Sequence, residues 1–242
     1  MQFVEANSFQ NASRTKADID RIVVHTAEIE LSTGAAEAIA GFFSNPTTEV
    51  SAHKCSDSDS VVRCVRDEDI AFHAAGDNPN TLGIEICTRA STSKEKWARP
   101  EHQAALHVAA RTCAEWAVLY DIPARWLTAD QERNHERGFV THKIVSDVFG
   151  EGIRSDPGAE FPYIKFMALV KQAMTEVRWE LWAKKSKAAN APVARVAAST
   201  WVNGANSDAK FNDFYPQMKT RVRELTEDGR RPQFRRQVRR AT

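Results

Sequence analysis

The sequence predicts a mixed α/β fold, mainly a central β-sheet flanked by helices, with a basic C-terminal extension. The β-branched run Arg21–Thr26 is typical of a buried strand. Residues Thr81–Cys87 carry apolar side chains at every second position, which is the period of a strand. From Pro100 onward, apolar residues recur every three or four positions and indicate an amphipathic helix. Strand and helix patterns alternate along the chain, so we expect both in one domain.

Composition shows an acidic body with a basic tail. The hydrophobic content of 42% can fill a core, which argues against a disordered chain. The net charge of +1 divides unevenly along the sequence. Residues 1–175 carry 18 Lys and Arg against 25 Asp and Glu, a net charge of −7. Residues 176–242 carry 15 against 7, a net charge of +8, so the tail is the part suited to anionic partners.

This asymmetry accompanies a change in composition near residue 188. Residues 1–187 form the predicted main domain, and residues 188–199, rich in Ala, Pro and Val, are the predicted linker. Residues 200–242 combine several aromatic residues with Arg-rich segments. They could form a small helical module, or a basic arm without a fold of its own.

The four cysteines are too few and too scattered for a disulfide framework. Because none of them forms a C-x-x-C pair, a zinc site made only of cysteines is excluded. We expect reduced thiols, with a Cys55–Cys64 disulfide across a hairpin as the alternative. The N-terminus has no basic region followed by an apolar run, so we expect no signal peptide. No apolar run approaches the roughly 20 residues of a membrane span, so we expect no membrane insertion.

The remaining elements are predicted from local signals. Residues 1–18 are predicted irregular, and the Ala-rich segment 34–43 is predicted helical. Segments 50–55 and 61–66 flank a turn of Ser and Asp, which indicates a hairpin. Residues 91–99 and 130–137 are predicted to be loops, and 160–185 return to helical spacing. The apolar positions of that last segment are Phe161, Ile164, Leu169, Met174, Trp179 and Trp182.

Two of the predicted strands carry residues capable of catalysis. His25 ends the first strand, although a histidine there is more often a core residue. Glu85 lies inside an apolar strand, where a carboxylate is costly to bury unless it is paired or used. The alternative for Glu85 is an edge strand that turns this charge to water. His53, on the predicted hairpin, is interpreted as structural.

The segment from Thr141 to Pro162 holds further candidates. His142, Arg154 and Asp156 lie there, and Asp156 directly precedes a Pro-Gly turn. Proline restricts the residue before it to extended conformations, so Asp156 is predicted outside a helix. A histidine and a carboxylate are both suitable zinc ligands, but a catalytic zinc needs a third protein ligand.

Six short pieces of the sequence carry a resemblance to a known family. In order along the chain they are Ile22–Thr26, Val50–His53, Phe72–Gly76, Leu82–Ile86, Thr141–His142 and Arg154–Pro162. Together they resemble the zinc-dependent N-acetylmuramoyl-L-alanine amidases of the peptidoglycan recognition protein type, which include many phage endolysins. The resemblance covers roughly residues 20–175.

The resemblance implies a role for each candidate. It implies that His25, His142 and Asp156 bind zinc, and that Glu85 transfers the proton. Arg154 is implied to stabilise the oxyanion beside zinc, and His73 to contact the substrate. In some relatives the position of Asp156 is a cysteine, and an aromatic residue stands at the position of Ala52.

The function implied is hydrolysis of the amide between N-acetylmuramic acid and L-alanine in bacterial peptidoglycan. This is expected of a phage endolysin, which is held in the host cytoplasm until it is released to the wall, and residues 200–242 would then be a candidate cell-wall-binding module. Alternatives within the same fold are a cytoplasmic amidase of cell-wall recycling and a non-catalytic peptidoglycan-binding protein. A nucleic-acid arm would account for residues 219–242 but would leave the metal ligands unused.

Overall fold

The computed structural model describes residues 1–150 and 152–188. The pattern of internal contacts divides the chain into a unit of Met1–Val177 and a unit of Arg178–Thr242. The predicted linker beyond residue 188 and the basic region 200–242 lie outside the described residues. The first unit holds every candidate site residue.

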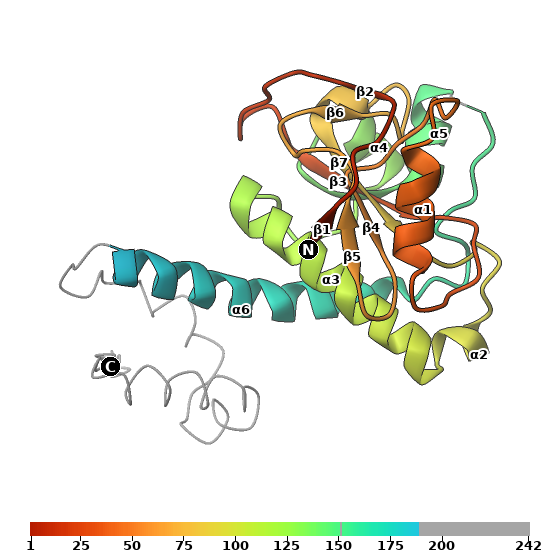
Figure 1. Ribbon diagram of the computed structural model, residues 1–242. Helices are drawn as coiled ribbons and strands as arrows, with labels where there is room; N and C mark the ends of the chain where they lie inside the picture. Colours follow the sequence, from red (N-terminus) through yellow and green to blue (C-terminus); the bar gives the residue numbers. More distant parts are fainter. Residues whose placement is uncertain (151, 189–242) are drawn as a thin grey trace. The chain divides into compact units, whose positions relative to one another are not determined.

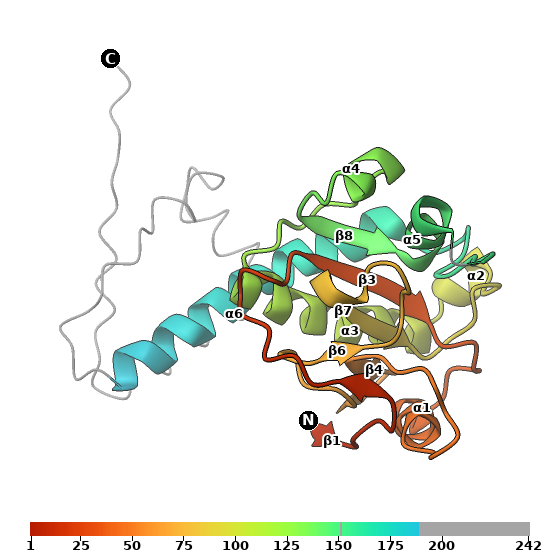
Figure 2. The same ribbon diagram turned by 90° about the horizontal axis from the view of Figure 1, so that it is seen from above.

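A six-stranded sheet forms the centre of this unit (Figures 1 and 2). Four neighbouring strands run parallel to one another: β4 (Lys54–Ser56), β7 (Thr81–Ile86), β3 (Arg21–Thr26) and β8 (Gly138–Thr141). Strand β5 (Val61–Arg63) is antiparallel to β4 and parallel to β1 (Gln2–Phe3). Parallel strands end at the same edge of a sheet, so the residues at those ends are brought together. In spatial order the strands are β1 (Gln2–Phe3), β5 (Val61–Arg63), β4 (Lys54–Ser56), β7 (Thr81–Ile86), β3 (Arg21–Thr26) and β8 (Gly138–Thr141).

The two central strands β3 and β7 are in a register that pairs His25 with Glu85. All six residues of β3 are buried. Helices cover both faces of a parallel sheet, which explains the unbroken apolar run in this strand. Because β7 lies between β4 and β3, Glu85 is not on an edge strand, and the alternative that it faces water there is wrong.

Helices cover both faces of the sheet (Figure 1). On one face, α3 (Pro100–Tyr120) and the first part of α6 (Tyr163–Ala188) pack with Leu82, Ile84 and Ile86 in the largest apolar core. On the other face lie α1 (Ala35–Phe43) and α5 (His142–Phe149). The alternation of β7 therefore turns Glu85 toward the face of α1 and α5, as the sequence predicts.

Most predicted elements are confirmed, with shifted ends. The strand Arg21–Thr26 and the helix Pro100–Tyr120 begin and end at the predicted residues. Helix α1 starts one residue later than predicted because Gly34 is its N-cap, with φ 82°. The hairpin forms, with strands shorter than predicted. The segment predicted to be helical from residue 160 forms α6, but Ile164 is 90% exposed and does not belong to its buried face. The side chains of Trp179 and Trp182 lie outside the described residues.

Three segments predicted to be irregular contain short elements. Residues 1–18 include β1 and β2 (Phe9–Gln10), which pairs with β6 (Ile70–Ala71). The loop 91–99 contains α2 (Lys94–Trp97), and the loop 130–137 overlaps α4 (Ala129–Arg133). A short 3-10 helix, Asn78–Asn80, precedes β7. The N-cap residues of these two missed helices are Ser93 and Thr128, whose hydroxyls accept hydrogen bonds from free backbone N–H groups of the first turn.

Cys55 and Cys64 are free thiols whose Sγ atoms lie 3.7 Å apart in the core. None of the described helices is long and apolar enough to cross a membrane.

At the start of β3, a fully buried arginine is surrounded by carboxylates. The guanidinium of Arg21 donates to both carboxylate oxygens of Asp77, with the Nε–Oδ2 distance at 2.9 Å. Glu132 Oε2 lies 3.6 Å from the same Nε and is buried as well. Burial, followed by the charge of Asp77, raises the pKa of Glu132. Arg21 is thus the cation that allows acidic groups to lie inside this end of the sheet.

We predict that Arg21→Met lowers the free energy of unfolding by about 3–5 kcal/mol, because it leaves Asp77 buried without its cation. Urea denaturation at neutral pH measures this loss. The matched control is Lys16→Met, which removes the exposed Lys16–Asp121 pair and should cost less than about 1 kcal/mol. Equal small losses in both variants would contradict the role given to Arg21.

Candidate metal centre

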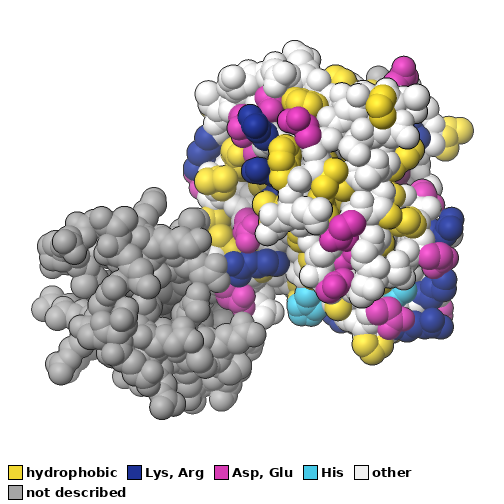
Figure 3. Space-filling model, viewed as in Figure 1, with side chains coloured by type: hydrophobic (Ala, Val, Ile, Leu, Met, Phe, Trp, Pro, Cys, Tyr) yellow, Lys and Arg dark blue, Asp and Glu magenta, His cyan; other side chains and the backbone are white. Residues whose placement is uncertain are grey.

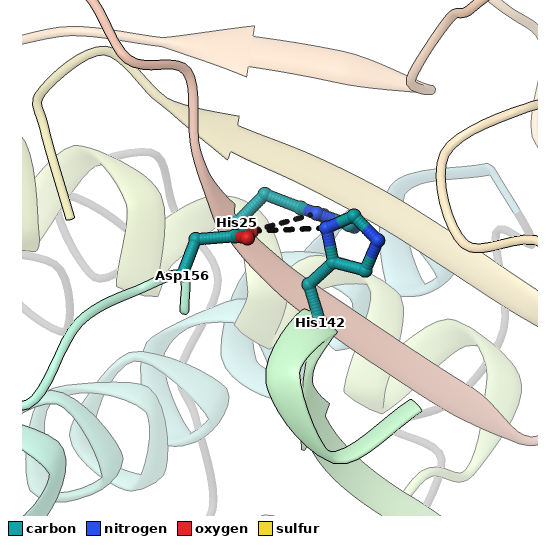
Figure 4. Close-up of side chains that lie close together, drawn as sticks. All are labelled: His25, His142 and Asp156. Carbon is teal, nitrogen blue, oxygen red and sulfur yellow. Dashed lines mark hydrogen bonds and ion pairs between the residues drawn. The ribbon is translucent and has the colours of Figure 1, made fainter. Parts of the chain in front are cut away.

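Three side chains from distant parts of the chain converge at the carboxyl edge of the parallel strands (Figure 4). His25 comes from the end of β3, His142 is the first residue of α5 directly after β8, and Asp156 lies in the loop that follows α5. Asp156 Oδ2 lies 3.1 Å from His25 Nδ1 and 3.2 Å from His142 Nδ1. One ligand atom from each residue falls within 4.8 Å of the others. The structure thus brings together the three residues that the resemblance implied as zinc ligands.

The surroundings of Asp156 and His25 favour the protonation states in which these two residues can bind a cation. Burial would raise the pKa of Asp156, but the rings of His142 and His25, whose Nδ1 atoms lie 3.2 and 3.1 Å from Oδ2, outweigh it and hold that pKa well below its ordinary value. Burial also lowers the pKa of His25, although Asp156 opposes the shift. A carboxylate and neutral imidazoles are the forms that bind a metal ion.

Asp156 is held in place through its backbone. Its carbonyl accepts a hydrogen bond from Lys143 N at 3.1 Å, which ties it to the first turn of α5. Two residues later, Gly158 has φ 101° and lies against the carbonyl of Ala90. A Cβ on Gly158 would come within 1.9 Å of Ala90 O, so this close approach requires glycine.

Glu85 lies beside the cluster, on the wall of a cleft. Its Oε2 is buried and has no hydrogen-bond partner among the described residues. Burial, followed by the negative charge of Asp156, raises the pKa of Glu85 to about 8. A carboxylate left unpaired at a cleft wall is a candidate proton carrier, since structural carboxylates are normally hydrogen-bonded.

The cleft has a polar side and an apolar side. Its volume is about 230 Å³. Arg154 lines the polar side; it is exposed and forms no hydrogen bond or ion pair with another described residue. Sequence reasoning missed the apolar side, although the pair Phe42-Phe43 at the end of a helix was a visible signal. The residues of that side are Ile39, Phe42, Phe43 and Val50, and Phe42 is 54% exposed.

The other two candidate histidines lie behind the cluster. His73 is buried and is not among the described residues that line the cleft; its Nδ1 lies 3.1 Å from His25 Nε2. In the structure His73 therefore contacts His25, a candidate metal ligand, whereas the sequence analysis expected His73 to contact the substrate. His53 is buried, and its Nδ1 accepts the N–H of Gly83 at 3.0 Å, which agrees with a structural role.

A model of the protein family described as N-acetylmuramoyl-L-alanine amidase matches residues 15–159. The match spans more than half of the chain and includes every candidate site residue. The chain belongs to the N-acetylmuramoyl-L-alanine amidase family.

Two solved structures share the fold of this amidase. The catalytic domain of XlyA is 20% identical, covers 70% of this chain and 97% of its own, and superposes with a TM-score of 0.50. The Staphylococcus aureus hydrolase AmiA, in complex with its ligand, is 17% identical, with coverages of 72% and 82% and a TM-score of 0.54. A search of curated protein sequences gives no match.

We predict that Gly158→Ala in this amidase weakens zinc binding by roughly tenfold or more, because the Ala90 carbonyl forces the loop and Asp156 to move. Isothermal titration of metal-free protein with Zn²⁺ measures the change. Gly41→Ala is the control, since Gly41 lies in a helix and a Cβ there meets nothing within 4 Å. Zinc affinity unchanged in Gly158→Ala would show that this contact does not hold Asp156.

Proposed function

We propose that this amidase hydrolyses, with zinc, the amide bond between N-acetylmuramic acid and L-alanine of peptidoglycan. The observation that carries the proposal is the convergence of His25, His142 and Asp156 on one point, beside a Glu85 Oε2 that has no partner in the part of the chain that the structure describes. Family membership supports peptidoglycan as the substrate.

The donor set fits a zinc ion. Two imidazole nitrogens and one carboxylate oxygen are the ligand types of catalytic zinc sites, which keep a further position open. The cleft reaches all three residues, so the open position would face solvent and substrate. When bound there, zinc would polarise the scissile carbonyl and lower the pKa of a water ligand toward about 7.

The chain's own residues would carry the remaining steps. The Glu85 carboxylate accepts the proton of the attacking water and then delivers it to the amide nitrogen as the C–N bond breaks. Arg154 stabilises the negative charge that develops on the carbonyl oxygen, and it cannot act as an acid because a guanidinium stays protonated. The apolar side of the cleft excludes water from the reacting groups.

The alternatives receive less support. A non-catalytic binding protein would not need a complete ligand set with an unpaired carboxylate beside it. On the face of the described residues shown in Figure 3, acidic and basic side chains are interspersed, which does not favour a nucleic-acid surface there. Between a phage endolysin and a recycling amidase, the +8 charge of residues 176–242 favours the endolysin, because soluble wall fragments need no wall anchor.

We predict that Glu85→Gln keeps one zinc per chain and loses roughly 100- to 10,000-fold in turnover, since it removes the proton acceptor and preserves the shape. Purified sacculi are the substrate, and mass spectrometry of the released products identifies the bond that is cut. The comparison variant His142→Ala should lose both zinc and activity.

Each outcome bears on a separate part of the proposal. Products cut at a bond other than the amide to L-alanine would overturn the substrate assignment. Near-normal turnover in Glu85→Gln would show that another group carries the proton. Full zinc content in His142→Ala would overturn the ligand assignment.

We also propose that the basic C-terminal region attracts the anionic polymers of the wall, and predict that truncation after Ala188 weakens wall binding at low salt. Exposed charges act over a Debye length of about 8 Å at physiological salt, so the advantage of the full chain should shrink as salt rises. Pull-down with cell walls across a salt series measures it, with zinc content as the control for the fold. If the full-length and truncated chains bind cell walls equally at low salt, the basic C-terminal region does not serve as a wall anchor.

A further inference from the structure

The second nitrogen of His25 is part of a buried hydrogen-bond chain that leads away from the cluster. His25 Nε2 lies 3.1 Å from His73 Nδ1, and His73 Nε2 lies 3.3 Å from the hydroxyl of Thr81. That hydroxyl donates to the carbonyl of Asp77 at 2.9 Å. All four residues are buried, so water does not compete for these groups.

The direction of every hydrogen bond in this chain follows from its last member. A carbonyl can only accept, so the single hydroxyl proton of Thr81 points to Asp77. Thr81 Oγ1 must then accept the proton of His73 Nε2. A neutral imidazole has one N–H, so His73 Nδ1 carries a lone pair and accepts from His25 Nε2. His25 is left with its free lone pair on Nδ1, the atom that faces His142 and Asp156.

We propose that His73 is a positioning residue, which holds His25 in the tautomer that offers Nδ1 to the metal ion. This inference rests on the metal site of the proposed function and assigns His73 a role other than the predicted contact with substrate. Metal-binding histidines ordinarily donate their other N–H to a fixed acceptor, which sets both the tautomer and the orientation of the ring.

The local structure is built to hold the His73 ring at this point. The side chain of Asn78 accepts hydrogen bonds from the backbone N–H groups of His73 and Ala74, at 3.0 and 2.7 Å. The ring lies over Gly83 of β7, where a Cβ would come within 2.5 Å of His73 Cγ. A glycine in the middle of a strand is otherwise unfavourable, and here it provides the space for the ring.

The opposite tautomer of His25 would compete with metal binding. With a proton on Nδ1, His25 would donate to Asp156 Oδ2 across the observed 3.1 Å, and this hydrogen bond would occupy two ligand atoms at once. Loss of the acceptor at His73 allows that state. The expected consequence is weaker metal binding, with the ligands themselves unchanged.

The test is the Zn²⁺ affinity of the metal-free full-length chain, measured by competition with a chromogenic chelator and without any substrate. His73→Phe keeps the ring and removes the acceptor, and should weaken zinc binding by about 10- to 100-fold. His73→Asn places an acceptor oxygen near the position of Nδ1, and should restore most of the affinity. His102→Phe is the matched control, because His102 is buried and contacts Trp97, away from the cluster.

Thr81→Val gives a second, independent test, since it removes the hydroxyl that orients His73 and nearly preserves the volume. It should weaken zinc binding in the wild-type background and cause no further loss in His73→Phe, because the two residues act through one chain. In the zinc-loaded protein, ¹⁵N NMR should detect the proton of His25 on Nε2.

Wild-type affinity in His73→Phe, or no rescue by His73→Asn, would overturn the proposal, and so would additive losses in the double variant. If His73→Phe does not fold, the affinity of Thr81→Val decides. Failure to cleave peptidoglycan would refute the proposed function and leave this result unaffected, because zinc affinity is measured without substrate turnover.

Discussion

The parallel alignment of β3 with β7 and β8 is the constraint on which the candidate site depends. It places the carboxyl ends of three strands at one edge of the sheet, and His25, Glu85 and His142 lie at those ends. The same alignment requires helices on both faces, which accounts for the burial of β3 and for the apolar core beneath α3. Ligands of open α/β sheets bind at this edge for the same reason.

Two carboxylates at this edge have opposite properties because their surroundings differ. Asp156 Oδ2 lies 3.1 and 3.2 Å from the Nδ1 atoms of two imidazoles, and despite burial these rings hold the pKa of Asp156 well below the ordinary value. Glu85 Oε2 has no hydrogen-bond partner among the described residues, and burial together with the charge of Asp156 raises the pKa of Glu85. One group is suited to remain a charged ligand and the other to take up and release a proton, a division of roles that depends on environment and not on residue type.

Buried histidines and acidic groups extend from this edge to the opposite end of the sheet. The carboxylate of Asp77 accepts hydrogen bonds from the guanidinium of Arg21, and the backbone carbonyl of Asp77 accepts one from the hydroxyl of Thr81. Through Thr81 and His73 the same residue is linked to His25. The ion pair that stabilises the start of β3 therefore also anchors the hydrogen-bond chain that ends at His25, a candidate metal ligand.

The sequence by itself determined the elements with strong periodicity and the identities of the clustered residues. Arg21–Thr26 and the helix from Pro100 are evident from side-chain patterns, which are local and survive without tertiary contacts. His25, His142 and Asp156 were found through short motifs in a fixed order. Short elements such as α2 and α4 were missed, because helices of four or five residues that are stabilised by capping residues leave little periodicity to detect.

Only the tertiary structure decided what surrounds each residue. It showed that β7 is internal, so that Glu85 faces a cleft and not bulk water. It also showed that His73 faces a ligand candidate and that Phe42 and Val50 form a cleft wall. These facts depend on strand order and on contacts between residues far apart in the chain. A local pattern fixes which side of a strand a residue occupies, but not which groups the fold brings to that side.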